Sequence, residues 1–328
     1  MRNIWTHLGL VPHVVGLAAF VSIALFPSLG LAFCRTTTCD GSKECPVSGG
    51  QNGRPCCKRF GCDDLGLPLY WPSSCVSYNI QEAGSKKLEI SAETLSTLVD
   101  RAFSRWVGAD CEGASISLSV EARGQASCGA PEFNENDDAG NANIWMFRDT
   151  GEISQAEDKQ IVGVPSSALA VTTISFNDKT GAILDVDVEL NSGSVKFTTT
   201  DEVGEIEFDL ESVVTHEAGH FLGLGHSSTR EAVMFSRYNP GSIDSRELGR
   251  DDIEGICAVY PTDREIPPLE ATCEPRGGYA TECYDAGCAC RVGKGPDSPG
   301  GSKEALLLGA ILCILVTRRR VKSYDRAT

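Results

Sequence analysis

The chain has 328 residues, of which 41% are apolar and 7% aromatic, and this composition supports a packed core and excludes an intrinsically disordered protein. The length suits one sizeable domain with smaller additions better than several large domains. The formal net charge of −16 at pH 7 excludes nucleic acid and anionic lipid head groups as main partners of the folded body.

Residues 1–32 have the pattern of an export signal. Arg2 precedes an apolar run at 14–26, and the small residues Gly30 and Ala32 end the segment. We therefore predict a signal peptide that is cleaved near Ala32. An N-terminal membrane anchor is the alternative, although the apolar run is short for a membrane span.

Cysteines are frequent after this signal. Fourteen of the fifteen lie between Cys34 and Cys290, and an even number in an exported body predicts up to seven disulfide bonds of unknown pairing. Residues 33–65 form a Cys-rich N-terminal segment. A cysteine-bound metal is the alternative, but the adjacent pair Cys56 and Cys57 does not fit zinc-ribbon spacing.

Residues 66–262 are predicted to form an α+β domain. Alternating apolar residues and turn residues predict strands at 76–80, 115–120, 143–147, 168–176 and 182–190, the last two joined as a hairpin by a turn at 177–181. Ser91 is the predicted N-cap of a helix that ends near residue 107. One face of this helix is apolar, with Leu95, Leu98, Val99, Ala102, Phe103 and Trp106 at helical spacing. Two more helices are predicted at about 210–224 and 250–259, which completes an α+β order of elements.

The most informative stretch is 215–226, which reads Thr-His-Glu-Ala-Gly-His-Phe-Leu-Gly-Leu-Gly-His. His216 and His220 are four residues apart, so both imidazoles leave the same face of a helix and can bind one Zn²⁺. Gly223 allows the chain to leave the helix, and His226 can then return as the third ligand. Three protein ligands leave the fourth position to water, as in a catalytic zinc site.

Glu217 follows the first predicted ligand and can act as the general base. It would accept a proton from the water that attacks a peptide carbonyl and return it to the leaving amine. The chain has five histidines, and the two outside this stretch, His7 and His13, lie in the export signal. The histidines of the mature protein therefore all belong to the predicted metal site.

These residues resemble the metzincin clan of zinc peptidases and, within it, the matrixin family. Met234, eight residues after His226, matches the methionine turn that metzincins place beneath the zinc. Residues 102–106, 226–228 and 251–260 are similar to other matrixin segments. The resemblance implies a zincin fold, with a mixed twisted sheet, an active-site helix and a C-terminal helix, here flanked by disulfide-rich segments. It also implies that a peptide substrate pairs with an edge strand, which by position is 168–176.

The sequence departs from the matrixin pattern in three respects. The long propeptide with a zinc-blocking cysteine is missing, and residues 127–132 resemble that switch only superficially. We expect a Cys111–Cys128 disulfide there instead. The histidines of the family's structural zinc are also missing, so a single zinc is expected. Asp185, Asp187 and Glu189 alternate with apolar residues, which favours a strand with one wet face, and the alternative is that Asp185 or Asp187 helps to bind structural Ca²⁺.

The C-terminal part is predicted to leave the domain. Residues 263–290 are a second Cys-rich segment with a knot of four cysteines, and 291–303 are a flexible linker. Residues 304–328 contain a short apolar run and an Arg cluster, and with Cys288 and Cys290 they resemble the C-terminal sorting tail of myxobacterial surface proteins. The resemblance implies display at the bacterial outer surface, with one of the two cysteines modified. The alternatives are an ordinary membrane anchor and a disulfide role for both cysteines.

The sequence therefore predicts a monomeric, exported zinc endopeptidase that hydrolyses extracellular proteins. The substrate pocket is predicted to depend on the loop at 235–243. Two other functions stay open: a catalytically silent zinc-fold adhesin, and a structural, disulfide-rich envelope protein. An intact Glu217 favours the peptidase, because a binding module needs no base beside its metal.

Overall fold

The computed structural model describes residues 33–38, 66–135, 139–150, 168–202, 204–266 and 272–283. The chain divides into the units Met1–Gly30 and Leu31–Thr328, and the described residues all belong to the second. The predicted signal peptide, the linker at 291–303 and the tail at 304–328 lie outside the described residues, as does most of 33–65. Within the described ranges no helix has the length and apolar character needed to cross a bilayer.

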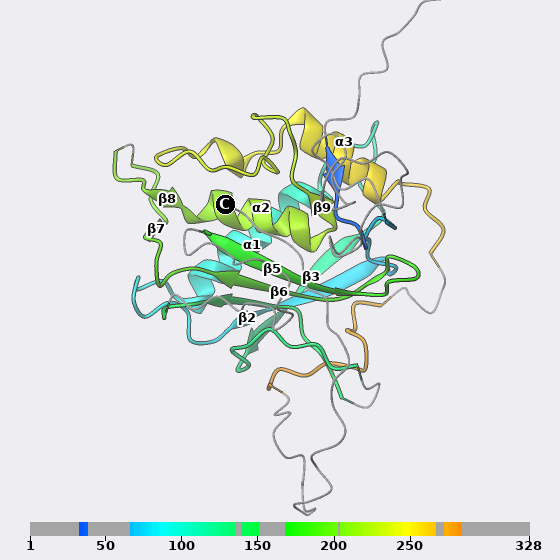
Figure 1. Ribbon diagram of the computed structural model, residues 1–328, viewed down its shortest axis with the longest axis horizontal. Coiled ribbons are helices and arrows are strands. Elements are labelled where there is room, and N and C mark those ends of the chain that lie inside the picture. The colour runs from blue at the N-terminus through cyan, green and yellow to red at the C-terminus, as the bar shows by residue number, and fades with distance from the viewer. Residues whose placement is uncertain are drawn as a thin grey trace, which may run out of the picture. The chain divides into compact units, whose positions relative to one another are not determined.

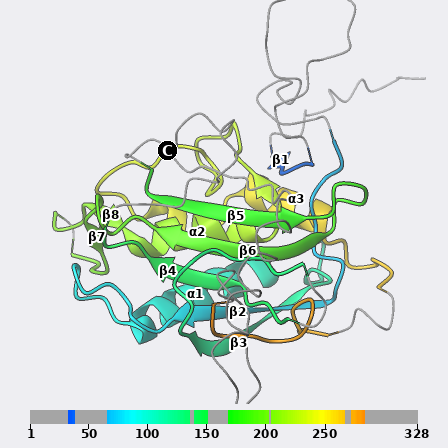
Figure 2. The same cartoon turned by 60° about the horizontal axis from the view of Figure 1, so that its bottom comes forward.

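A five-stranded mixed sheet forms one layer of the domain (Figures 1 and 2). Its strands follow the order β3-β2-β4-β6-β5, with the bounds β2 Cys75–Gln81, β3 Ser119–Ala126, β4 Ile144–Phe147, β5 Ala170–Phe176 and β6 Ile183–Leu190. The pairs within β3-β2-β4-β6 are parallel, and β5 alone runs antiparallel, against β6. The strand predicted as the substrate-pairing edge is thus an edge of the sheet.

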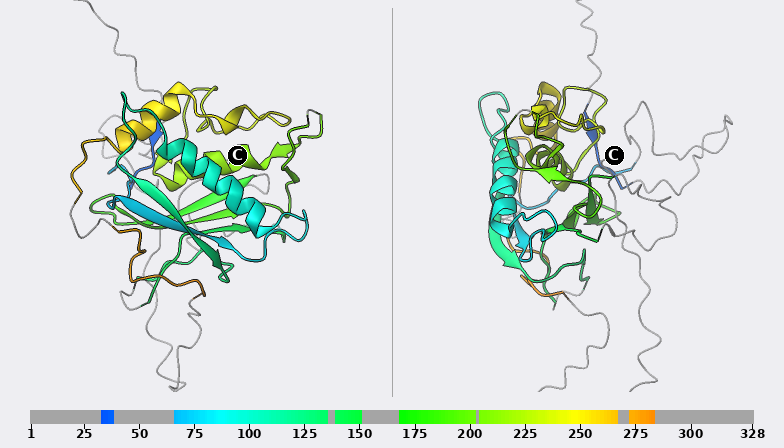
Figure 3. Two further views of the ribbon diagram at one scale, coloured as in Figure 1. Left: turned by 180° about the vertical axis from the view of Figure 1, so that it is seen from behind. Right: turned by 90° about the vertical axis from the view of Figure 1, so that its left-hand side faces the viewer.

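Three helices match the predicted positions within a few residues. They are α1 (Ala92–Val107), α2 (Leu210–Phe221) and α3 (Arg250–Val259). Thr94 N donates to the side chain of Ser91, which confirms the predicted cap of α1. Figure 3 shows α1 and α2 on the same side of the sheet, and α2 contacts β5 and β6.

Aromatic side chains fill the space between these helices and the sheet. Phe103 of α1 packs edge-on against Trp145 of β4 and Phe221 of α2, with ring centroids 5.8 and 5.0 Å apart. Trp106 is fully buried, and its indole N–H donates to Thr215 O of α2 at 2.8 Å. The predicted apolar face of α1 is buried, and it positions α2 against the sheet.

Short elements surround this core. β1 (Cys34–Arg35) pairs with β9 (Leu224–Gly225), and β7 (Phe197–Thr198) pairs with β8 (Phe208–Asp209). A 3₁₀ turn, η1, covers Asp244–Arg246. The pairing of β1 with β9 brings residues 33–38 against the segment that leads to His226.

The strand predicted at 115–120 is wrong in position, because β3 begins only at Ser119. Ile116 and Leu118 are buried without being in a strand, which explains their alternation. β3 itself is an edge strand with mostly exposed, polar side chains, so it lacks the apolar pattern that identifies half-buried strands.

The predicted Cys111–Cys128 disulfide is also wrong. Cys111 pairs with Cys257 of α3, and Cys128 pairs with Cys283. The two cysteines flank the eight-residue strand β3 in the sequence, and each is bonded to a residue from the C-terminal part of the chain instead.

The C-terminal cysteines that the structure describes do not form a separate knot. Cys273 pairs with Cys75 at the start of β2, and Cys283 pairs with Cys128 after β3. Residues 272–283 are thereby bonded to the start of β2 and to the segment that follows β3. Cys288 and Cys290 lie outside the described residues.

Candidate metal centre

Two of the predicted metal ligands lie on α2. Asp209 caps the helix by accepting from Ser212 N at 2.8 Å. His216 and His220 then fall one turn apart, and their ring centroids are 4.7 Å from each other. The helix therefore brings both imidazoles to one face, as their spacing predicts.

Gly223 turns the chain so that His226 returns to the same point. Its φ of +91° is in the left-handed region, and a Cβ there would lie 2.7 Å from Leu69 O. Only glycine fits this turn without strain. His226 then lies with its ring centroid 5.2 Å from His216 and 4.8 Å from His220.

Backbone carbonyls orient the two helical rings. His216 Nδ1 lies 2.6 Å from Val233 O, and His220 Nδ1 lies 2.8 Å from Leu224 O. A carbonyl only accepts, so each Nδ1 carries the proton and each Nε2 keeps its lone pair. Burial, followed by repulsion from His220 and His226, lowers the pKa of His216 well below its ordinary value, and the ring is neutral.

The three rings fit a tetrahedral zinc ion. Their nearest ring nitrogens all lie within 4.8 Å of one another, and His220 Nε2 is 3.2 Å from His226 Nε2. Two nitrogens that bind one tetrahedral zinc at 2.0–2.1 Å are about 3.3–3.4 Å apart. Among the described residues, the buried Nε2 of His216 has no hydrogen-bond partner, as expected for a nitrogen that binds a metal ion.

Glu217 is fully buried beside these rings. Thr172 of β5 donates its hydroxyl to Glu217 Oε2 at 2.5 Å. Sequence reasoning did not single out Thr172. The one signal was a polar pair, Thr172 and Thr173, inside an otherwise apolar strand.

Met234 lies under α2, as expected for a methionine turn. It is 2% exposed, and its carbonyl accepts from Ser227 N at 2.7 Å. A Cβ on Gly219 would lie 2.3 Å from Met234 Sδ, so the helix and the turn pack without room for a side chain. Asp252 of α3 holds the turn by accepting from Val233 N at 2.7 Å and Met234 N at 3.1 Å.

A pocket opens next to His216 and Glu217. Apolar side chains from three segments line it, together with polar ones: Leu169, Val213, Val233, Phe235, Tyr238, Ser212, Ser236, Arg237 and Ser245. Residues 235–238 belong to the loop that the sequence associates with the substrate pocket. The apolar part of this lining therefore lies next to two of the predicted site residues, His216 and Glu217.

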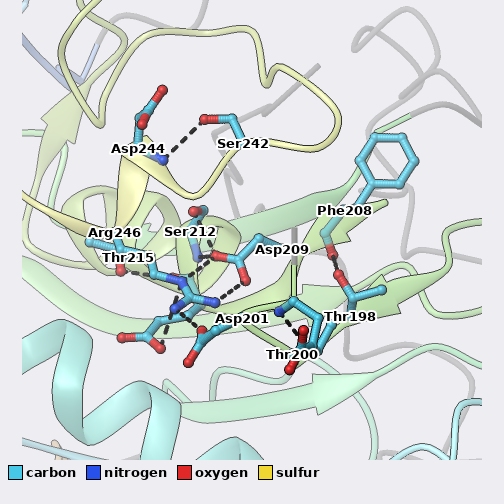
Figure 4. Close-up of polar contacts among 12 residues, drawn as sticks. Thr198, Thr200, Asp201, Phe208, Asp209, Ser212, Thr215, Ser242, Asp244 and Arg246 are labelled. Carbon is cyan, nitrogen blue, oxygen red and sulfur yellow. Dashed lines mark hydrogen bonds and ion pairs between the residues drawn. The ribbon is translucent and has the colours of Figure 1, made fainter. Parts of the chain in front are cut away.

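Arg246 anchors the far side of this loop to α2 (Figure 4). Its guanidinium forms two hydrogen bonds with the buried carboxylate of Asp209, at 2.6 and 2.8 Å, and a third with Asp201 at 2.5 Å. The hydrogen bond to Asp209 raises the pKa of Arg246 above its ordinary value. Tyr238 also connects the loop to the N-cap of α2, since its hydroxyl accepts a hydrogen bond from Asp209 N at 2.9 Å. The pocket wall and the N-terminus of α2 are therefore connected by hydrogen bonds.

The predicted wet face of the strand at 182–190 is wrong. Asp185, Asp187 and Glu189 are at most 2% exposed, because the segment around Glu132 covers them. Asp187 accepts from Ile144 N and Glu132 N, both at 2.8 Å, and Glu189 forms an ion pair with Arg148. We refer to Asp185, Asp187 and Glu189 as the acidic face of β6.

Two other groups of possible metal ligands occur among the described residues. One joins Glu121 to Cys75 and Cys273, and the other joins Glu132 to Cys128 and Cys283. Both cysteine pairs are disulfides, so neither group offers a thiolate. The three histidines are the best-equipped metal ligands in the described part of the chain.

Comparisons with known proteins agree with this geometry. Residues 132–261 match the model of the matrixin family, and they include α2, α3 and all three histidines. Metalloendoproteinase 1-MMP of Arabidopsis thaliana is 28% identical over 194 residues, which are 58% of this chain and 44% of that protein. Metalloendoproteinase 5-MMP of the same plant is 56% identical over 52 residues, 16% of this chain and 14% of that protein. Matrilysin of Homo sapiens is 50% identical over 46 residues, 14% of this chain and 17% of that protein.

The matched part of this chain spans less than half the length of each of these relatives. The match of residues 132–261 to the matrixin family model, together with the mixed sheet, confirms the predicted α+β fold. Helix α1 and strands β2 and β3 precede the residues that match the family model.

Proposed function

We propose that this chain is a zinc-dependent endopeptidase of the matrixin type that hydrolyses extracellular proteins. The observation that carries this proposal is the convergence of His216, His220 and His226 beside the buried carboxylate of Glu217. The matrixin domain at 132–261 and the matrix metalloproteinases among the relatives support a zinc metalloprotease.

The three imidazoles would hold the zinc through their Nε2 atoms, and Val233 O and Leu224 O keep two of the rings in the required tautomer. A zinc ion at this place supplies Lewis acidity for the attacking water and for the peptide carbonyl. No second zinc is part of this proposal.

Glu217 moves the proton in this reaction. Its carboxylate lies next to His216 at the pocket, where it accepts a proton from the water as the oxygen attacks the carbonyl carbon. It then donates that proton to the nitrogen of the leaving amine, which leaves the carboxylate ionised for the next turnover. The buried position keeps bulk water from competing for the proton.

The substrate would lie along β5. This strand is an edge of the sheet and can pair with an extended peptide by backbone hydrogen bonds. Its neighbour Leu169 lines the pocket together with Phe235 and Tyr238, so a side chain of the bound peptide could enter there. Partners of the protein are therefore protein and peptide substrates.

Export, surface display and calcium are separate parts of the proposal. They rest on the sequence patterns of 1–32, of 304–328 and of Asp185 with Asp187. We infer a monomer that is secreted or held at the cell surface through its tail. A calcium-selective chelator that leaves zinc bound should lower Tm if Asp185 or Asp187 binds Ca²⁺, and an unchanged Tm would refute that site.

The alternative function is a zinc-fold adhesin with little or no catalysis. It predicts zinc binding without turnover. The pocket beside Glu217 favours the peptidase, because a purely structural metal site needs neither a base nor an open cleft.

Cleavage of casein or gelatin by the purified, oxidised protein tests the proposal. The wild type should cleave, a zinc chelator should stop it, and Glu217→Ala should lower turnover by roughly 10²- to 10⁴-fold while zinc stays bound. Equal inactivity of wild type and Glu217→Ala over a broad substrate panel would establish the adhesin instead.

A further inference from the structure

The contact between Thr172 and Glu217 joins the edge of the sheet to the metal-binding helix. Thr172 Oγ1 donates to Glu217 Oε2 at 2.5 Å, and both side chains are 0% exposed. An ionised carboxylate can only accept, so the hydroxyl is the donor. The distance between Thr172 Oγ1 and Glu217 Oε2 is that of a strong, charge-assisted O–H···O⁻ hydrogen bond.

The sheet fixes the position of this hydroxyl. Thr172 pairs with Val188 of β6, in a ladder that runs the length of β5. Successive side chains of a strand point to opposite faces, so Thr172 faces α2 and Thr173 points the other way. A threonine side chain is also stiff at χ1, because both of its branches are attached to Cβ. The donor therefore has little freedom to follow the carboxylate if the carboxylate turns.

We propose that Thr172 is a positioning residue for catalysis, and that its hydroxyl holds Oε2 of Glu217 so that Oε1 is the oxygen that exchanges the proton. The inference rests on the proposed peptidase function. It assigns different roles to the two oxygens of the general base, which neither the motif nor the family match does.

The proton balance of the reaction is unchanged by Thr172. Oε1 accepts one proton from the attacking water and returns it to the leaving nitrogen, while the Thr172 hydroxyl keeps its own proton. The hydroxyl contributes orientation, because without this hydrogen bond the carboxylate of Glu217 can rotate about its Cγ–Cδ bond. If Glu217 is correctly oriented for a smaller fraction of the time, kcat falls, whereas the affinity for the substrate does not change.

The first experiment compares substitutions at Thr172 in the purified, zinc-loaded protein. Thr172→Val exchanges the hydroxyl for a methyl group of similar size, and we expect kcat to fall about 10- to 100-fold with KM changed by less than about twofold. Thr172→Ser keeps the hydroxyl and should recover most of kcat. Zinc content should stay at one ion per chain in both variants.

Thr215→Val is the matched control. It removes another fully buried threonine hydroxyl, which donates to Glu211 O at 2.7 Å within α2. This variant should lose stability and keep the wild-type kcat. If Thr172→Val has the wild-type kcat, the positioning role is refuted. Equal losses for Thr172→Val and Thr172→Ser would also refute it, because they would assign the effect to packing.

A second experiment needs no catalysis. In the zinc-free protein, Thr172→Val should lower Tm by about 3–6 °C, because a buried carboxylate loses a hydrogen bond. The same substitution in a Glu217→Ala background should have a clearly smaller effect, since no carboxylate is left to bond. Equal shifts in the two backgrounds would overturn the inference.

These outcomes separate the inference from the proposed function. A wild type that binds zinc and cleaves nothing would refute the peptidase, whatever the Tm cycle shows. An active wild type with an unaffected Thr172→Val would leave the peptidase intact and refute the role of Thr172.

Discussion

The candidate metal centre and the acidic face of β6 are two buried clusters of titratable side chains in one domain, and their polar atoms have different partners. At the metal centre, Nδ1 of His216 and of His220 bonds to a backbone carbonyl, and the Nε2 atoms face one another. On β6, Asp187 uses both oxygens to accept backbone N–H groups, and Glu189 pairs with Arg148. Burial alone therefore does not identify a metal site. Convergence of lone pairs on one point does.

We expect the largest effect from removing one of the three predicted zinc ligands. His220→Ala removes one of three ligands, and we expect zinc affinity to fall more than about 100-fold, since loss of a mere outer-shell contact costs 10- to 100-fold. Peptidase activity should disappear with the metal. Zinc content after dialysis, together with competition by a zinc chelator, measures the change.

The acidic face of β6 supplies the control for this variant. Asp185→Asn changes a buried acidic side chain in the same domain, and it should retain one zinc per chain. Full zinc retention by His220→Ala would show that the ion is bound elsewhere and would remove the difference between the two clusters.

A buried carboxylate near the metal centre sharpens the comparison. Asp252 accepts from Val233 N, Met234 N and Gly249 N, at 2.7, 3.1 and 2.8 Å, and Val233 in turn orients His216. Asp252→Ala leaves two buried N–H groups and the half-buried N–H of Gly249 without an acceptor, so we expect the free energy of unfolding to fall by about 3 kcal/mol. Urea denaturation measures this loss.

Asp251, which precedes Asp252 on α3, provides a matched control. Asp251 accepts from the Ser227 hydroxyl at 2.6 Å, and Asp251→Ala should cost only about 1 kcal/mol. Asp252→Asn keeps one acceptor oxygen, so its loss in the free energy of unfolding should lie between those of Asp252→Ala and Asp251→Ala. If Asp251→Ala were the more damaging change, the methionine turn would not depend on Asp252.

The convergence of the three histidines at the candidate metal centre was predictable from the sequence because its determinants are local. The spacing of His216 and His220, the left-handed Gly223 and the return of His226 lie within one helix and its exit. The helices α1, α2 and α3 are also specified locally, by caps and by periodic apolar residues. In these regions short-range chemistry and the final structure agree.

The acidic face of β6 was misread because its environment is set by distant residues. Alternation shows that the side chains of Asp185 and Asp187 share a face, but only the chain path brings Glu132 over that face. The same holds for the partner of Cys128 and for Thr172, whose role depends on a helix 45 residues away. Disulfide pairing and the packing of strand faces are long-range properties that no local pattern encodes.

The smallest expected effect concerns pH and the acidic face of β6. Burial raises the pKa of Asp187 to about 8, and burial together with the negative charges of Asp187 and Glu132 raises the pKa of Asp185 well above its ordinary value. The charge of Asp187 acts directly on the buried Asp185, and this repulsion is relieved when one of the two carboxyl groups carries a proton. Because both oxygens of Asp187 already accept N–H groups, we place that proton on Asp185.

This protonated pair makes the folded protein sensitive to alkali. The folded pKa of Asp187 is about 8 and that of Asp185 is also raised, and both lie above the unfolded value of about 3.9. The stabilisation from bound protons is therefore complete below about pH 4 and is lost as the pH rises through about 8 and through the raised pKa of Asp185. The free energy of unfolding should fall between about pH 6 and 9 by at most about 1.4 kcal/mol per pH unit for one proton. In Asp185→Asn a side-chain amide can donate to Asp187 at every pH, so its slope should be flatter. Zinc binding also depends on pH, so both proteins are compared by urea denaturation at the same zinc saturation and without calcium. Equal slopes would mean that the pair holds no proton, and the carboxylates of β6 would then need a cation just as the histidines do.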